Sequence, residues 1–153
     1  MQDSPGLLCL EPAECLRLLD TVRIGRIVYT DRALPAVLPV TFVVRGGDLM
    51  IRTGPERRLA AATDTVVAFE ADEFDDAGRR GWSVTAVGRA IAVTDPAERA
   101  EISALPLPAW APAAQSTYLR IEIELLNGHR IESIEAPETA PCTDGTGPAA
   151  EPS

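Results

Sequence analysis

Hydrophobic and polar residues alternate over short segments along most of the chain. The clearest case is residues 117–126, where Leu119, Ile121, Ile123 and Leu125 fall on one face and charged residues fall on the other. A period of two is typical of a half-buried antiparallel strand. Clusters of apolar and β-branched residues predict further strands at residues 24–30, 38–44, 49–53, 66–70 and 82–94.

Turn-forming residues indicate how these strands connect. Arg45-Gly46-Gly47-Asp48 predicts a hairpin at the centre of the chain. Asn127-Gly128 is a strong two-residue hairpin signal, so residues 130–134 are expected to pair back as a last short strand. Gly88 lies in the middle of the longest strand and predicts a bulge or bend that lets a sheet curl.

Three short segments have the pattern of helices. Pro12 opens the first, Asp95 and Glu98 form a capping box at the start of the second, and residues 57–63 are rich in Arg, Leu and Ala. Six or seven short strands with few helices predict a mainly β fold with a few short helices, arranged as a mostly antiparallel barrel.

The apolar periodicity also sets the expected domain organisation. The chain has 153 residues, which suits one domain with its own core. We expect an N-terminal extension at residues 1–10 and a barrel domain at residues 8–134. From residue 135 onward Pro, Gly, Thr and Glu dominate, so residues 135–153 are expected to be a disordered acidic tail.

Charge and composition limit the kinds of binding partner and the cellular location that are expected. The net charge of -9 argues against nucleic acid and anionic membranes, which need an extended basic face. The most apolar run, residues 33–44, is too short to span a bilayer, and no signal peptide is evident, so a cytoplasmic protein is expected. Cys9, Cys15 and Cys142 have no pairing pattern, and a disulfide framework is not expected.

One segment concentrates groups that suit an anion. Arg52, Thr53, Arg57 and Arg58 place three guanidinium groups and a hydroxyl within seven positions, next to the start of a predicted helix. Since all 14 basic residues are Arg, any phosphate contact must use planar, bidentate guanidinium groups. The same pattern also fits a solvated, charged helix start, and both interpretations stay open. A single His excludes most His-based metal sites.

The order of several short motifs resembles a known family. The motifs are Cys15 to Leu19, Gly25-Arg26, Leu38-Pro39-Val40, Arg52-Thr53-Gly54, Arg58-Leu59, Phe69-Glu70, Gly81-Trp82-Ser83-Val84 and Gly88-Arg89-Ala90. In this order and spacing, residues 8 to 134 resemble the pyridoxamine 5'-phosphate oxidase-like split-barrel family, and more narrowly its small actinobacterial FMN-binding branch. The resemblance implies a split β-barrel that binds FMN.

The resemblance also implies a set of cofactor-binding residues. The strand at Pro39, Val40 and Thr41 would run along the isoalloxazine ring, with Thr41 where many relatives have Asn. Arg52, Thr53 and the basic residues before Leu59 would hold the phosphate, with Arg58 where Lys is usual. Trp82 and Ser83 would meet the pyrimidine end of the flavin, although Trp82 equally fits an aromatic residue that covers the barrel core. The residues implied are Pro39, Val40, Thr41, Arg52, Thr53, Arg57, Arg58, Leu59, Trp82 and Ser83.

Partners and catalysis are less defined. The family resemblance implies a homodimer with the flavin at the subunit interface, where Trp110 or the His129-Arg130 turn would act across the dyad. By its position after Asn127-Gly128, His129 also fits an exposed hairpin residue. The Arg-x-His pair of the true oxidase is replaced by Gly128-His129-Arg130, so pyridoxal phosphate synthesis is not expected and no catalytic residue is identified.

Three functions remain compatible with these observations. The first is an FMN-dependent oxidoreductase of unknown substrate, in which the flavin carries the reactivity. The second is a non-catalytic flavin-binding module, a reservoir or sensor. The third is a barrel that binds haem or the deazaflavin F420 instead of FMN, and haem would have His129 as its one possible His ligand.

Overall fold

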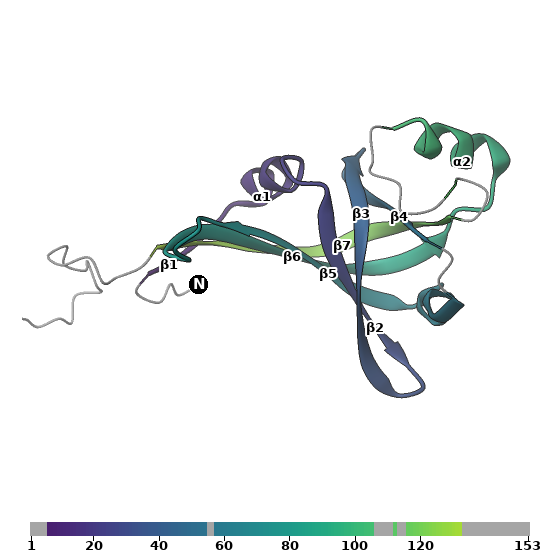
Figure 1. Cartoon of the computed structure of the whole chain (residues 1–153), viewed down its shortest axis with the longest axis horizontal. Helices are drawn as coiled ribbons and strands as arrows, with labels where there is room; N and C mark the ends of the chain where they lie inside the picture. The colour runs from purple at the N-terminus through teal and green to yellow at the C-terminus, as the bar shows by residue number, and fades with distance from the viewer. Residues whose placement is uncertain (1–5, 55–56, 106–111, 113–115, 133–153) are drawn as a thin grey trace, which may run out of the picture.

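The computed structural model describes residues 6–54, 57–105, 112 and 116–132, and within them a mainly β protein (Figure 1). Its strands are β1 (Leu7–Cys9), β2 (Ile24–Asp31), β3 (Leu34–Arg45), β4 (Asp48–Thr53), β5 (Val66–Phe74), β6 (Arg80–Ala92) and β7 (Thr117–Glu132). Its helices are α1 (Pro12–Leu19), the 3-10 helix η1 (Arg57–Ala62) and α2 (Pro96–Ser103).

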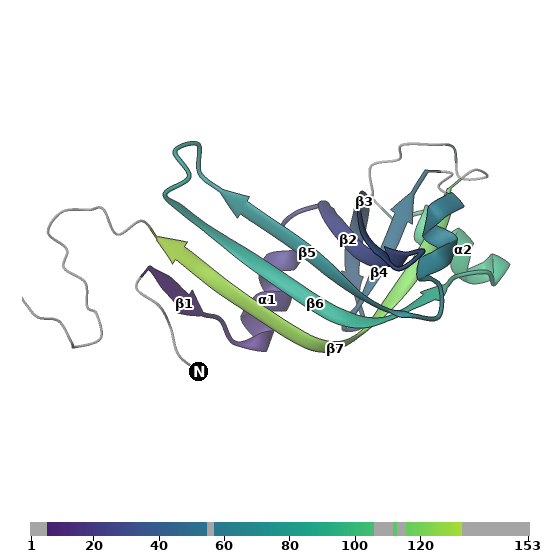
Figure 2. The same cartoon turned by 90° about the horizontal axis from the view of Figure 1, so that it is seen from below.

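The strands form one antiparallel sheet that closes on itself. The order is β1-β7-β4-β3-β2-β5-β6, and β6 pairs with β7 to complete a ring of six strands. β7 can close the ring because it is long: its first residues pair with β4, and most of its length pairs with β6. Figure 2 shows β6 and β7 curving together along the molecule, with β1 at their outer end. The predicted mainly β split barrel is confirmed.

The bulge expected at Gly88 is present and changes the phase of β7. Val87 pairs with Leu125 but Gly88 pairs with Ile123, so Glu124 is the extra residue. A Cβ atom on Gly88 would lie 2.0 Å from the backbone oxygen of Glu122, so only glycine allows this close approach. Beyond the bulge the strand faces invert, and Leu125, expected on the buried face, is instead 60% exposed.

The hairpin predicted at Asn127-Gly128 is wrong. Both residues lie inside β7, which continues to Glu132 and pairs with β6 throughout. Gly128 is glycine for a packing reason: a Cβ atom there would lie 2.5 Å from the Sγ atom of Cys15 on α1. His129 is therefore a half-buried strand residue, not an exposed turn residue.

Two hydrophobic clusters stabilise the barrel. The main core fills its interior and includes the edge-to-face pair Phe42 and Phe69, with ring centroids 4.7 Å apart. α1 covers this core with three buried residues, Cys15, Leu18 and Leu19. A smaller cluster lies on the outer face of β4 and β7 beneath α2, and its buried members are Met50, Val93, Ile102 and Tyr118.

The remaining sequence predictions have mixed outcomes. The central hairpin and helices α1 and α2 are confirmed, and the Asp95 carboxylate accepts a hydrogen bond from the Glu98 backbone N–H at 3.0 Å. The helix predicted at residues 57–63 is the 3-10 helix η1 at Arg57–Ala62, and β5 extends into the predicted acidic loop, to Phe74. β1 was not predicted. Trp110, Cys142 and the expected tail lie outside the described residues. Among the described helices, none has the length and apolar composition needed to span a membrane.

Candidate functional site

Several predicted site residues come together on the outer face of the barrel. Strand register places Thr41, Arg52 and Tyr118 side by side on β3, β4 and β7. Two residues along β3, Pro39 faces the same way and is aligned with Arg26 on β2. The outer face thus carries a continuous path of side chains from β7 around to β2.

At one end of this path Arg52 lies under α2. Its side chain is 7% exposed, its Nε atom donates a hydrogen bond to the hydroxyl of Ser116 at 3.3 Å, and its guanidinium lies 5.7 Å from the centre of the Tyr118 ring. Arg99 of α2 lies over the same ring at 4.5 Å. The Thr41 hydroxyl donates to the backbone oxygen of Arg52 at 3.0 Å, which ties β3 to β4 at this point. Two guanidinium groups therefore share one aromatic ring.

At the other end Ser83 belongs to a polar cluster on β2, β5 and β6. Its hydroxyl donates to Glu70 at 3.3 Å, and Glu70 also accepts from Arg26 at 2.7 Å. Asp72 lies 3.8 Å from the same guanidinium. Burial raises the pKa of the Glu70 carboxyl, and its hydrogen bond with Asp72 and the charge of Asp72 add to this rise, while Arg26 opposes it.

Other predicted residues point into the barrel instead. Val40 and Leu59 are fully buried core residues, and Trp82, at 5% exposure, also packs in the main core. Thr53 is buried, and as the neighbour of Arg52 on a strand it faces the opposite side of the sheet. The structure therefore does not place Arg52 and Thr53 on one face, although the sequence puts them next to each other.

Arg57 and Arg58 begin η1, four and five residues after the end of β4. Their backbone positions are described but their side chains are not, so the expected contact of these guanidinium groups with phosphate remains a prediction. η1 packs against β2, and its buried residues Leu59 and Ala62 anchor it to the main core. The start of η1 is therefore held near the end of β4 by hydrophobic packing.

Sequence reasoning missed four side chains that shape the outer face: Arg26, Glu70, Arg99 and Tyr118. Arg26 and Glu70 were noticed as parts of family motifs but not as members of a site. Their contact depends on the pairing of β2 with β5, 44 residues apart, which no local pattern reveals. The signal for Tyr118 was its place on the charged face of a strand that otherwise carries Arg and Glu.

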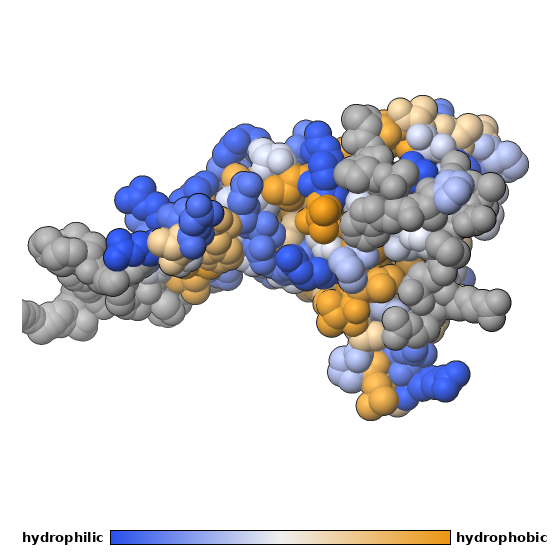
Figure 3. Space-filling view, in the orientation of Figure 1, coloured by the Kyte–Doolittle hydropathy of each residue, from blue (hydrophilic) through white to orange (hydrophobic). Residues whose placement is uncertain are grey.

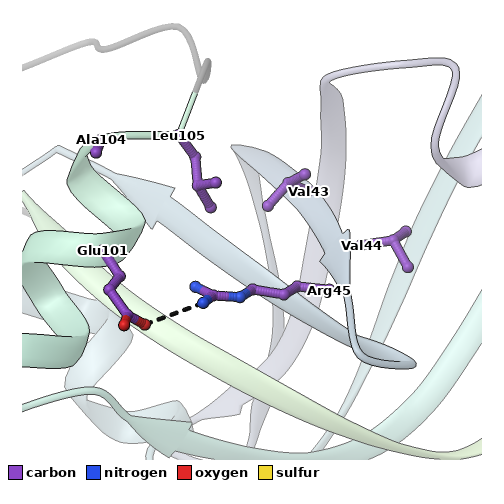
Figure 4. Close-up of a pocket in the computed structure, with 6 residues that line it drawn as sticks. All are labelled: Val43, Val44, Arg45, Glu101, Ala104 and Leu105. Atoms are coloured by element: carbon purple, nitrogen blue, oxygen red, sulfur yellow. Dashed lines mark hydrogen bonds and ion pairs between the residues drawn. The ribbon is translucent and has the colours of Figure 1, made fainter.

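An open groove of about 460 Å³ lies between the end of β3 and α2. Figure 4 shows Arg45 and Glu101 reaching across it, and these two side chains form an ion pair at 3.0 Å. Both are largely exposed, so the pair contributes little to stability. The groove contains none of the predicted site residues. Within the described residues no group of three or more His, Cys, Asp and Glu could hold a metal ion.

Comparison with known proteins identifies relatives of nearly the whole barrel. The family model of pyridoxamine 5'-phosphate oxidase matches residues 11–130. An uncharacterized protein of Mycobacterium tuberculosis is 39% identical over 136 residues, which cover 85% of this chain and 89% of that protein.

Two solved structures show the same fold at useful sequence identity. The FAD binding protein of Mycobacterium smegmatis is 33% identical, with a TM-score of 0.67, and the match covers 81% of this chain and 97% of that one. A candidate pyridoxamine 5'-phosphate oxidase of Corynebacterium glutamicum is 30% identical, with a TM-score of 0.70 and coverage of 87% and 98%.

Proposed function

This chain belongs to the pyridoxamine 5'-phosphate oxidase-like family, and we propose that it binds a flavin nucleotide, FMN in the first instance. The observation that carries this proposal is the match of nearly the whole barrel to a flavin-binding protein at 33% identity. The polar path on the outer face supports it, because this path offers guanidinium groups at one end and hydrogen-bonding groups at the other.

On this proposal the phosphate lies toward Arg52 and the start of η1, and the isoalloxazine ring lies along Pro39 toward Ser83. Guanidinium groups bind phosphate through charge-assisted hydrogen bonds, each worth about 1.5 to 3 kcal/mol. The exposed β3 backbone near Pro39 offers polar groups to the edge of the ring. The Ser83 hydroxyl already donates to Glu70, so its oxygen is left to accept a hydrogen bond from the flavin.

Changing Arg52 and Arg58 together to Ala tests this placement. The double variant is expected to lose FMN during gel filtration while its circular dichroism spectrum stays that of the wild type. An Arg45→Ala variant is the control, because Arg45 is an exposed cation at the α2 groove, away from the proposed site. Equal FMN affinity in the double variant and the wild type would place the phosphate elsewhere.

We propose further that the protein is an FMN-dependent oxidoreductase of unknown substrate in the cytoplasm, in which the bound flavin would supply the redox chemistry. Stopped-flow mixing with NADH or NADPH tests for turnover, and rapid bleaching of the flavin absorbance is the expected result.

The second candidate function is a non-catalytic flavin reservoir or sensor, which predicts retained flavin that no added reductant reduces. Nothing in the described residues favours haem or F420 over a flavin nucleotide.

The protein also acts as a homodimer with the flavin at the subunit interface. An apolar row crosses five strands of the outer face in register, next to the polar path, and consists of Val37, Val28, Ala68, Val87 and Leu125. Val37 and Leu125, at its ends, are each 60% exposed. Figure 3 shows further apolar surface along the projecting β2–β3 hairpin. A row of this kind on a sheet face is typical of a protein interface.

A further inference from the structure

Glu70 fixes the direction of the hydrogen bond that it forms with Ser83. An ionised carboxylate has no hydrogen to give, so in this contact, at 3.3 Å, the Ser83 hydroxyl donates to the Oε2 atom of Glu70. A serine hydroxyl carries a single hydrogen, and this contact uses it. The oxygen of Ser83 keeps only its lone pairs for any other group, so it can accept a further hydrogen bond but cannot donate one.

Arg26 holds the Glu70 side chain in the position that this contact needs. Its guanidinium donates to the other carboxylate oxygen of Glu70, Oε1, at 2.7 Å. Arg26 is the register partner of Glu70 on β2, whereas the register partner of Glu70 on β6 is Thr85 and not Ser83. Glu70 therefore reaches Ser83 along a diagonal, which a long side chain can span. One carboxylate oxygen is thus anchored by β2, and the other is directed to Ser83.

The other neighbour of Ser83 on β5 keeps the same direction. Asp72 is the register partner of Ser83, and its carboxylate also only accepts hydrogen bonds when it is ionised. Neither ionised side chain on β5 can therefore give a hydrogen to the Ser83 oxygen. The Glu70 side chain is 27% exposed and Ser83 is half-buried, so water competes less with this charge-assisted contact than it would on an open surface.

We propose that Glu70 is a positioning residue that makes Ser83 an acceptor-only group and thereby selects a ligand that offers an N–H at this point. The inference rests on the proposed function, under which the isoalloxazine ring lies along Pro39 toward Ser83. The oxidised ring has one N–H group, which lies between the two carbonyl groups of its pyrimidine half. A site that hydrogen-bonds such an N–H discriminates strongly against an analogue that lacks it.

Glu70→Gln tests the direction of the hydrogen bond because it keeps the shape of the side chain. Arg26 would hold the amide oxygen, so the amide NH2 group would face Ser83 and donate to it, and the Ser83 hydrogen would turn toward the ligand. Binding of FMN and of 3-methyl-FMN, which lacks the ring N–H, is measured at about pH 8, well above the ordinary pKa of a carboxyl group.

The wild type is expected to bind 3-methyl-FMN about tenfold more weakly than FMN, and Glu70→Gln to bind FMN about tenfold more weakly than the wild type. In the variant the difference between the two flavins should largely disappear. A methyl group that is only too large for the site would weaken binding equally in both proteins. An equal effect of the methyl group in wild type and Glu70→Gln would overturn the inference and leave the proposed function standing.

Glu73→Gln is the matched control, because it removes the same charge from the same strand. Glu73 is exposed, and its register partner is Trp82 rather than Ser83. This variant is expected to bind both flavins as the wild type does. If it lost the discrimination between them as Glu70→Gln does, the loss of charge would explain the effect and the positioning role would be overturned.

A measurement on flavin-free protein separates this inference from the proposed function. The free energy of unfolding is measured for Glu70→Ala, Ser83→Ala and the double variant. Because the two side chains are in contact, the loss in the double variant is expected to be smaller than the sum of the two single losses. Additive losses would overturn the inference even if flavin binds. Non-additive losses in a protein that binds neither flavin would support the Glu70–Ser83 contact and reject the proposed function.

Discussion

Single residues in this barrel have properties that depend on neighbours distant in sequence. Glu70 sits between Arg26 and Ser83 on the outer face and is also hydrogen-bonded to Asp72. Burial and the neighbouring Asp72 carboxyl raise the pKa of Glu70 by more than the Arg26 guanidinium lowers it. The pKa of Glu70 is therefore raised from its ordinary value of 4.5. The sequence motif Phe69-Glu70 gave no indication of this arrangement.

The raised pKa of Glu70 predicts a pH-dependent stability. A carboxyl that binds its proton more tightly in the folded state stabilises the fold below pH 4.5, and this contribution is lost as the pH rises through the folded-state pKa. In Glu70→Gln that contribution is absent. The free energy of unfolding is measured by urea denaturation for both proteins. As the pH rises from about 4 to 7, the free energy of unfolding of the wild type should therefore decrease relative to that of the variant. A difference that stays constant over this range would contradict the assignment.

Cys15 is a buried thiol on the core-facing side of α1, and its position predicts low reactivity. Burial raises its pKa, and the charges of Glu14 and Glu11 add to this effect. A thiol with a raised pKa forms little thiolate, which is the reactive form. In a Cys142→Ser background, Ellman's reagent should titrate the exposed Cys9 at once and Cys15 only after unfolding. Rapid reaction of two thiols in the folded protein would contradict this packing.

At the scale of elements, local patterns predicted the strands and helices well but not the phase of β7. The alternation at residues 117–126 is real up to the bulge opposite Gly88, and there an extra residue inverts the faces. The sequence signalled a bulge on β6, but the added residue is on the partner strand. Asn127-Gly128 has the pattern of a turn, but this glycine allows the close packing of Cys15 against β7.

The bulge predicts a specific cost for Gly88→Ala. The added Cβ atom would lie 2.0 Å from the backbone oxygen of Glu122, and backbone atoms cannot rotate away as a side chain can. We expect the free energy of unfolding to fall by about 1–3 kcal/mol, the usual range for overpacking. Chemical denaturation checks this, with Thr85→Ala on the same strand as the control. A loss no larger than that of the control would mean that the bulge adjusts freely.

At the scale of the molecule, the sequence predicted the barrel because its motifs occur in the order of a known family, but it could not predict the outer face. Thr41, Arg52 and Tyr118 meet only through the register of three strands. The same holds for the apolar row that ends at Leu125, since the bulge is what turns this residue outward. Strand order and register are global properties, and no local spacing encodes them.

The apolar row predicts that a single charge disrupts the proposed dimer. Leu125→Asp places a carboxylate in the row, and burying it against a second copy without a partner would be strongly unfavourable. We expect the molar mass from light scattering after gel filtration to fall from that of a dimer to about half. Leu8→Asp is the control, because Leu8 is also about half exposed, at 51%, but lies on β1 outside the row. Loss of the dimer in both variants, or in neither, would contradict this interface.

The visible spectrum of the purified protein tests whether this barrel binds a flavin nucleotide. The protein is purified without added cofactor, mixed with FMN or FAD, and passed through gel filtration before the spectrum is recorded. We predict a flavin spectrum that stays with the protein at close to one flavin per chain, and weaker retention of riboflavin, which has no phosphate to bind the guanidinium groups. A folded protein that elutes colourless after mixing with FMN and also after mixing with FAD would contradict flavin nucleotide binding.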